Sequence, residues 1–197
     1  SYCKKYQVEN DAMHNLYVRM PGADKDKPVL QLDAHSDECG FMVQTIHDNG
    51  VLGIIMLGGF MLNNIPAHSV IIRTRSGKRV KGIITSKPVH FMNAKERASQ
   101  DLDIEKIYVD VGATSRKEAE EAFGISIGDP MMPDVSFSYD EEHGICCGKA
   151  FDNRAGCACI VDTMDQLFEE REKLAVQGVG AFATQEEMGM RGAIVTA

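Results

Sequence analysis

The sequence predicts an α/β protein in which one α/β domain, built from residues 1–44 and 146–197, carries a β-barrel-like insert over residues 45–145. Apolar strand-like and helix-like segments at both ends of the chain support the α/β domain. Short apolar runs separated by turn residues in the middle support the β-rich insert. The hydrophobic fraction of 44% over 197 residues is sufficient for a packed core.

The first expected strands lie in the N-terminal third of the chain. Residues 27–35 form an apolar run that leads into ionisable residues, and residues 40–43 form a second apolar run. A third run, 51–57, ends at the Gly58-Gly59 pair, which interrupts regular structure. Each of these segments predicts a strand.

The rest of the insert shows a hairpin, a strand and a short helix. Two strand-like segments, 70–75 and 78–84, flank Ser76-Gly77, which is the pattern of a β-hairpin. Residues 107–111 predict another strand. Ser115 then begins a helix, because Glu118 completes a capping box and Gly124 is a stop signal.

The C-terminal part has a different pattern. Apolar residues recur at helical spacing over residues 155–170, which predicts a helix with one buried face. Residues 179–184 are continuously apolar, as in a strand of a parallel sheet that is covered on both faces. Residues 191–197 predict the beginning of a further helix.

Charge and composition limit the classes of partner. The net charge of −8 argues against nucleic acid and anionic membranes, which attract basic surfaces. No apolar run approaches the ~18–20 residues of a membrane span, and no signal-peptide core precedes the first strands. The six cysteines form no C-x-x-C pair, so we expect reduced, buried thiols, with a metal pair at Cys157 and Cys159 as the alternative. We therefore expect a cytoplasmic protein.

The first of three polar clusters is residues 33–38, which contains His35 and Asp37 directly after a predicted strand. Sites in open α/β sheets lie beyond the carboxyl ends of strands. In an extended backbone His35 and Asp37 point to the same side, and a histidine with a carboxylate partner is typical of a metal site. The alternative is a solvated surface turn.

The second and third clusters contain Asp152 and the pair Glu186-Glu187. Asp152 precedes the predicted 155–170 helix, where an aspartate is most often an N-cap. The two glutamates follow a buried strand, where adjacent carboxylates repel unless a cation offsets their charge. One carboxylate that binds a metal and one that transfers protons would resolve this cost, although a solvated turn is the alternative. Together the clusters predict a site for zinc, cobalt or manganese.

These three clusters carry a resemblance to a known family. Residues 32–43, 148–156 and 184–193 resemble the motifs of the glutamyl and deblocking aminopeptidases, in the same order and at similar spacing. Weaker similarity occurs at residues 11–16 and 109–113. Members of this family are dinuclear-metal exopeptidases that assemble into tetrahedral, TET-type particles. The resemblance implies a zinc-exopeptidase-like α/β/α domain, here partial, with an inserted β-barrel-like dimerisation domain.

The resemblance also implies a role for each residue. His35 would bind one of two divalent metal ions, zinc in preference to cobalt or manganese, and Asp37 would orient and polarise that histidine. Asp152 would bridge both metals, Glu187 would bind the second metal, and Glu186 would act as the general base. The chain would be a metal-dependent aminopeptidase that uses metal-activated water on short peptides.

The chain departs from the family pattern at its ends. Two further metal ligands of the family, an aspartate and a histidine, would lie after Ala197, and the first helix of the family is not recognisable. Three alternatives therefore stay open: a carboxypeptidase or aminoacylase of related fold, a metal-free glycosidase, and an inactive fragment whose insert serves only assembly.

Self-association through the insert is the last expectation. Apolar residues at 54–57 and 60–62 are candidates for a symmetric contact between two copies of the chain. The same residues could instead fill the core of the insert.

Overall fold

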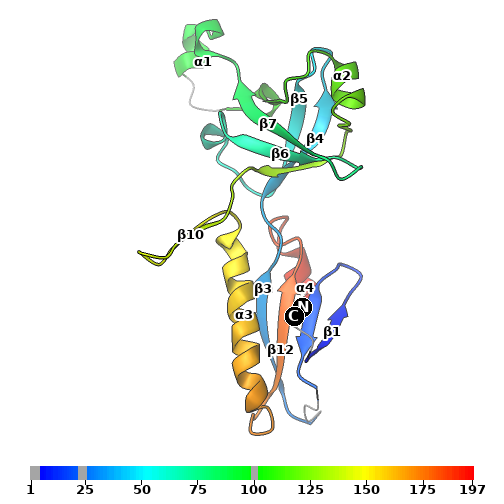
Figure 1. The fold of residues 1–197 in the computed structure, drawn as a ribbon, viewed down its shortest axis with the longest axis vertical. Helices are drawn as coiled ribbons and strands as arrows, with labels where there is room; N and C mark the ends of the chain where they lie inside the picture. The colour runs from blue at the N-terminus through cyan, green and yellow to red at the C-terminus, as the bar shows by residue number, and fades with distance from the viewer. Residues whose placement is uncertain (1–4, 22–25, 99–101) are drawn as a thin grey trace. The chain divides into compact units, whose positions relative to one another are not determined.

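The computed structural model describes residues 5–21, 26–98 and 102–197, and the chain divides into two compact units (Figure 1). The first unit comprises residues 1–38 and 150–197, and the second comprises residues 39–149. The predicted boundary at residues 44 and 45 falls within strand β4 (Gly40–Ile46), which belongs to the second unit.

The discontinuous unit contains a four-stranded sheet in the order β1-β2-β12-β3, formed by β1 (Gln7–Asn10), β2 (Leu16–Arg19), β12 (Gln177–Ala183) and β3 (Val29–His35). Strand β12 runs parallel to β3 but antiparallel to β2. The expectation of a parallel sheet around residues 179–184 was therefore wrong in part. The sheet is mixed because the β1–β2 hairpin, which the sequence reading missed, pairs with the other edge of β12.

Two helices accompany this sheet: α3 (Phe151–Glu169) and α4 (Arg191–Thr196). Helix α3 contacts both β3 and β12 (Figure 1). Its buried residues Ile160 and Met164 pack with Val18, Met20 and Ala34. A side chain at Gly180 would place its Cβ 2.8 Å from Ile160, so this glycine permits the close approach of helix and strand.

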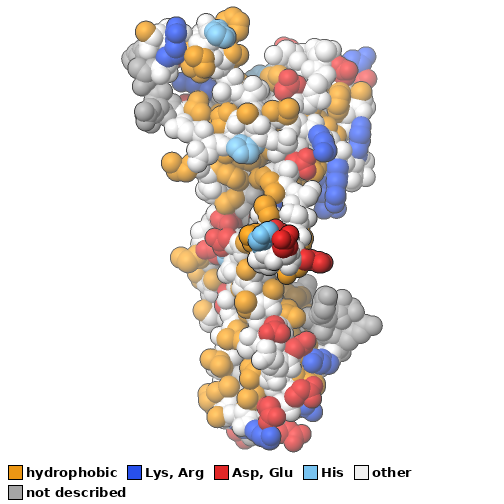
Figure 2. Space-filling view, turned by 60° about the vertical axis from the view of Figure 1, so that its left-hand side comes forward, with side chains coloured by type: hydrophobic (Ala, Val, Ile, Leu, Met, Phe, Trp, Pro, Cys, Tyr) orange, Lys and Arg blue, Asp and Glu red, His pale blue; other side chains and the backbone are white. Residues whose placement is uncertain are grey.

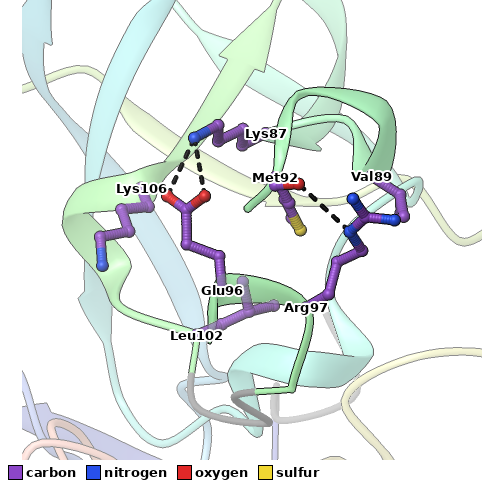
Figure 3. A pocket seen from close by; sticks show the side chains of 7 residues that line it. All are labelled: Lys87, Val89, Met92, Glu96, Arg97, Leu102 and Lys106. Carbon is purple, nitrogen blue, oxygen red and sulfur yellow. Dashed lines mark hydrogen bonds and ion pairs between the residues drawn. The ribbon is translucent and has the colours of Figure 1, made fainter. Parts of the chain in front are cut away.

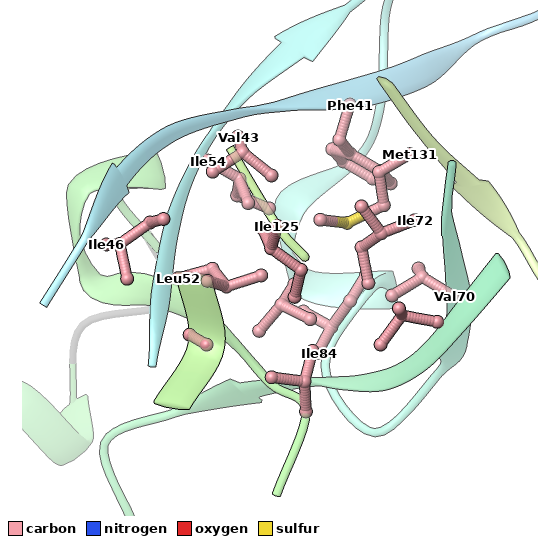
Figure 4. Close-up of a cluster of buried hydrophobic side chains, with 14 of the residues drawn as sticks. Phe41, Val43, Ile46, Leu52, Ile54, Val70, Ile72, Ile84, Ile125 and Met131 are labelled. Carbon is pink, nitrogen blue, oxygen red and sulfur yellow. The ribbon is translucent and has the colours of Figure 1, made fainter. Parts of the chain in front are cut away.

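The second unit is a closed six-stranded barrel in the order β4-β5-β8-β7-β6-β9. The other five strands are β5 (Leu52–Leu57), β6 (Ser69–Arg73), β7 (Arg79–Ser86), β8 (Ile107–Asp110) and β9 (Pro130–Pro133). Phe41, Leu52, Ile72 and Ile84 point into the barrel and are almost completely buried (Figure 4). Closure leaves no free strand edge in the barrel.

Short elements join and cover the barrel strands. The hairpin predicted around Ser76-Gly77 is confirmed, because β6 and β7 pair antiparallel. Helix α2 (Arg116–Glu121) begins as predicted, since Ser115 Oγ accepts a hydrogen bond from the Glu118 amide at 3.2 Å. The remaining elements are η1 (Leu62–Asn64), η2 (Val89–Phe91), α1 (Ala94–Ala98), η3 (Ile104–Lys106), β10 (Ser138–Asp140) and β11 (Ile145–Cys147).

Two expectations about side-chain exposure need correction. Most of the apolar residues proposed for a contact between copies belong to the barrel's own packing: Ile54 is buried, and Met56, Phe60 and Leu62 pack against the core. Met61 is 73% exposed, and hydrophobic side chains are scattered over the surface of both units (Figure 2).

The expectation of buried cysteines also fails. Cys146, Cys147 and Cys159 are exposed, and Cys39 and Cys157 are partly exposed, while Cys3 lies outside the described residues. Among the helices that the structure describes, none is long and apolar enough to cross a bilayer.

Candidate functional site

The chain topology brings the three polar clusters of the discontinuous unit to one edge of the sheet. Strands β3 and β12 are parallel, and their last residues, His35 and Ala183, are partners in the register. The Ser36 amide continues this pairing with a 2.8 Å hydrogen bond to the Ala183 carbonyl. Helix α3 connects the barrel to β12 and therefore begins near the carboxyl ends of the strands. His35, Asp152 and the two glutamates consequently meet at this edge.

His35 occupies the centre of the cluster and is 7% exposed. Its Nδ1 lies 3.3 Å from the carbonyl oxygen of Asp37, and its Nε2 lies 3.0 Å from a carboxylate oxygen of Asp152. Both oxygens can only accept a hydrogen bond; we take the tautomer with the proton on Nδ1, because it leaves Nε2 able to bind a metal. Nε2 then directs its lone pair at carboxylate oxygens of Asp152, at 3.0 Å, and Glu186, at 3.6 Å. Facing lone pairs repel, so a proton or a metal cation is needed between them.

Both glutamates lie in the same cluster. One ligand atom each from His35, Glu186 and Glu187 can be chosen so that all three lie within 4.8 Å of one another, and both glutamates are half-buried. An imidazole and carboxylate oxygens are ligands that zinc accepts at ~2.0–2.2 Å. The residues present thus fit a divalent cation by their chemistry and spacing.

Asp37 holds the backbone of the glutamate pair. Its two carboxylate oxygens accept hydrogen bonds from the amides of Glu186 and Glu187, at 3.2 Å each. The same carboxylate lies 3.6 Å from Nδ1 of His35, which is too long for a hydrogen bond. The backbone carbonyl of Asp37 therefore orients the histidine in this structure, and its carboxylate orients the glutamates.

Asp152 does not act as the helix cap that its position suggested. It has the non-helical angles φ −84° and ψ 106°, and its side chain is 89% exposed. Asn153 takes over the capping role, because its Oδ1 accepts a hydrogen bond from the Gly156 amide at 3.1 Å. The Asp152 carboxylate is therefore free to point at His35.

Several supporting residues escaped the sequence reading. Arg154 Nε donates to the Ser36 carbonyl at 3.2 Å, and Cys157 Sγ donates to the His35 carbonyl at 3.2 Å. Burial raises the pKa of the Cys157 thiol, which keeps it protonated as a donor. These contacts hold the backbone at the histidine and at the residue that follows it.

Asp11 and Asn15 lie in the segment of weaker similarity, residues 11–16, but the sequence assigned them no role beyond the turn that an Asp and an Asn in a short connection indicate. Partial burial raises the pKa of the Asp11 carboxyl, but hydrogen bonds from Asn15, Tyr17 and Met13 outweigh that effect and hold it below its usual value. Asn15 is completely buried and bonds to the segment that carries the glutamates.

The barrel unit contains a separate cavity of about 230 Å³ between η2, α1 and η3 (Figure 3). Glu96, the one carboxylate among the described residues that line it, accepts hydrogen bonds from Lys87 at 2.9 and 3.0 Å and from the Asn93 amide at 2.7 Å. None of the predicted site residues lines this cavity. Because Glu96 is already neutralised by Lys87, the cavity is not a candidate for metal chemistry.

Comparison with known proteins identifies a family whose members share this arrangement of elements. The family model described as M42 glutamyl aminopeptidase matches residues 14–197. The glutamyl aminopeptidase of Lactococcus lactis is 30% identical over 97% of this chain and 53% of its own length. The lysyl aminopeptidase of Pyrococcus furiosus is 29% identical over 96% of this chain and 52% of its own length.

Solved structures give the same result. The TET aminopeptidase from a marine sediment Thaumarchaeota archaeon matches with a TM-score of 0.88 and 33% identity, over 99% of this chain and 52% of that protein. The TET1 peptidase of Pyrococcus horikoshii, which can assemble into a tetrahedron or a large octahedral shell, matches with a TM-score of 0.81 and 25% identity, over 98% and 55%. This chain thus spans about half the length of the relatives that it matches.

Proposed function

The chain belongs to the M42 glutamyl aminopeptidase family, and we propose that it supplies metal ligands and the proton-transferring carboxylate of an aminopeptidase that removes single residues from the N-termini of peptides. One observation carries this proposal. Side chains from three distant segments of this chain converge at the carboxyl ends of two neighbouring parallel strands: His35, Asp152 and the pair Glu186-Glu187.

In this proposal His35, Asp152 and Glu187 would hold two divalent metal ions, with zinc preferred over cobalt and manganese. The lone-pair contact of His35 Nε2 with the Asp152 carboxylate, at 3.0 Å, supports a cation at this position. The charge of the two adjacent glutamates supports it too, because half-buried carboxylates favour a nearby positive charge. When bound, such ions act as Lewis acids and lower the pKa of water towards neutrality.

Glu186 moves the proton in this scheme. Its carboxylate accepts a proton from the attacking water, whose oxygen then forms a bond to the carbonyl carbon of the first peptide bond. Glu186 returns the proton to the leaving nitrogen as the carbon–nitrogen bond breaks, which releases one amino acid and a shortened peptide. The Asp37 carboxylate keeps Glu186 in position by accepting a hydrogen bond from its backbone amide at 3.2 Å, and the Asp37 carbonyl supports the His35 tautomer that carries its proton on Nδ1.

Metal removal and restoration test the function. The natural full-length chain is treated with a chelator, dialysed, and assayed on a panel of aminoacyl-p-nitroanilides and short peptides before and after zinc, cobalt or manganese is added. Activity that is lost on chelation and restored by a divalent metal is expected. Hydrolysis that persists in the fully metal-free protein would contradict the proposal.

The same panel separates the alternatives. Peptides with an amidated C-terminus should be cleaved from the N-terminus, whereas a carboxypeptidase would leave them intact because it requires the free carboxylate. An aminoacylase would release acetate from acetylated amino acids. A cellulosic substrate tests the glycosidase alternative. Glycoside hydrolysis by two carboxylates needs no metal, so this activity would survive chelation. The proposal requires the release of single residues from the N-terminal end of the peptides.

We also propose that the barrel unit, residues 39–149, mediates self-association. Exposed apolar side chains on this unit, among them Met61 (73% exposed), Val89 (60%) and Phe91 (74%), support the proposal. The particle formed by the Pyrococcus horikoshii relative supports it by analogy. Light scattering should give an assembled species, and replacement of Met61 and Phe91 by Gln should shift it towards the monomer; an unchanged mass would remove this surface from consideration.

A further inference from the structure

We propose that Asn15 is a positioning residue for the candidate site: its side chain clamps both ends of the loop, residues 184–192, that carries Glu186 and Glu187. The roles of these two glutamates are those of the proposed function, on which this assignment rests. Asn15 lies in the turn between β1 and β2, far in sequence from the loop that it holds.

The oxygen of the Asn15 side chain holds the beginning of the loop. Oδ1 accepts a hydrogen bond from the Thr184 amide at 2.9 Å. The Thr184 hydroxyl lies 3.1 Å from the same oxygen and 2.8 Å from the Met13 carbonyl, and we assign its single proton to the shorter contact. Both bonds tie the end of strand β12 to the β1–β2 turn.

The nitrogen of the same side chain holds the end of the loop. Nδ2 donates one hydrogen to the Gly192 carbonyl at 3.3 Å and the other to Asp11 Oδ2 at 2.8 Å. The side-chain amide of Asn15 is completely buried, and each of its hydrogen-bonding groups therefore has a partner. An amide at this position can hold two segments at once because it has a donor and an acceptor at opposite sides of one rigid group.

Asp11 fixes which side of the amide faces which segment. Its carboxylate can only accept, and it takes hydrogen bonds from Asn15 Nδ2, the Tyr17 hydroxyl and the Met13 and Asn15 amides. The nitrogen of Asn15 must therefore face Asp11, which directs Oδ1 at Thr184. A neutral amide in place of Asp11 would remove this constraint.

The loop needs support from outside. Its internal bonds close it at the base, where the Gly192 amide donates to the Thr184 carbonyl at 2.9 Å. Gln185 and Met190 have φ values of 56° and 54°, in the left-handed region that residues other than glycine rarely adopt. Such backbone persists only where surrounding contacts impose it. Asn15 at the base and Asp37 at Glu186 and Glu187 provide those contacts.

Substitution of Asn15 by Asp, alone and together with substitution of Asp11 by Asn, tests the clamp in the natural full-length protein. Asn15→Asp places the carboxylates of residues 15 and 11 about 2.8 Å apart, where they repel. It also replaces the donor that faces the Gly192 carbonyl with an oxygen, so that hydrogen bond is lost. We expect a loss of metal affinity of about 10- to 100-fold, as for residues that orient metal ligands, with a lower kcat and little change in KM. Adding Asp11→Asn restores a donor between the two side chains and should recover part of the loss, but not the bond to Gly192.

Met164→Ala is the matched control, because it destabilises the same sheet from the helix side without touching the loop. It should lower the melting temperature and leave metal affinity and kcat unchanged. Equal effects of Asn15→Asp and Met164→Ala at matched stability would overturn the assignment, as would a double variant no better than the single one.

Amide hydrogen exchange at Glu186 and Glu187 separates failure of the clamp from failure of the proposed function. Exchange should accelerate in Asn15→Asp and slow again in the double variant, whether or not the protein is a peptidase. If Asn15→Asp does not fold, Asp11→Asn alone should accelerate the same amides, since the Asn15 amide then loses its fixed orientation. Unchanged exchange in a folded variant would overturn the clamp even where metal-dependent activity is present.

Discussion

Gly192→Ala should disrupt the glutamate loop more than any ordinary Gly-to-Ala change. A Cβ at this position would lie 2.1 Å from the Thr184 carbonyl oxygen, 2.6 Å from the Thr184 nitrogen and 2.5 Å from Asn15 Oδ1. Two of these atoms are backbone, so they cannot rotate away, and the loop must open at its base. Opening breaks the hydrogen bonds of the Gly192 amide and carbonyl, each worth about 0.5–1.5 kcal/mol. With the cost of overpacking, about 1–3 kcal/mol, we expect a total loss of about 2–6 kcal/mol.

Urea unfolding and metal titration together measure this effect. The expected result is a lower midpoint at constant slope, with metal binding weakened because the loop carries Glu186 and Glu187. Gly59→Ala is the control, since a Cβ there meets nothing within 4 Å; it should change stability by less than about 0.5 kcal/mol. A Gly192→Ala protein as stable as the control, with unchanged metal affinity, would refute the packing argument.

Three further predictions concern other parts of the chain. Met164 is 1% exposed in the helix–sheet interface, so Met164→Ala should cost about 2–5 kcal/mol in urea unfolding, and a loss below 1 kcal/mol would mean that this core is loosely packed. Ser115→Ala removes the cap of α2 and should cost about 0.5–2 kcal/mol, measurable as a lower melting temperature of the barrel, whereas an unchanged value would show that the cap is dispensable. Hydrogen bonds from Tyr6 and Lys5 hold the pKa of Asp165 below its usual value, so its stabilisation is present above about pH 4 and is lost as the pH falls through the lowered pKa. Melting curves from pH 7 to 3 should therefore show less acid destabilisation in Asp165→Asn than in the parent protein, and parallel curves would contradict this.

The sequence predicted those features that short segments determine. The β6–β7 hairpin follows from two alternating runs around Ser76-Gly77, and α2 follows from its capping residues. The positions of His35 at the end of one strand and of the glutamate pair after another also followed from local pattern. Their convergence depended on two strands being parallel neighbours, and the resemblance of the motifs was needed to propose it.

The features that the sequence did not predict depend on partners distant in the chain. The direction of the strands beside β12 depends on which segment pairs with it, and β1 and β2, with four residues each, were too short to give a clear strand pattern. The cap of α3 passed from Asp152 to Asn153, a shift of one residue that propensity cannot resolve. Asn15 looked like an ordinary turn residue, because its importance comes from Thr184 and Gly192.

Substitution of the two adjacent glutamates tests the central proposal most directly. Metal content per chain and turnover of an aminoacyl-p-nitroanilide are measured for Glu186→Gln and Glu187→Gln in the natural full-length protein. Glu186→Gln should retain its metal while turnover falls by ~10²-fold or more, because only the proton carrier is lost. Glu187→Gln should lose metal, because an amide is a poorer ligand than a carboxylate. Equal metal loss in the two variants, or full metal content in Glu187→Gln, would contradict the proposed division of roles.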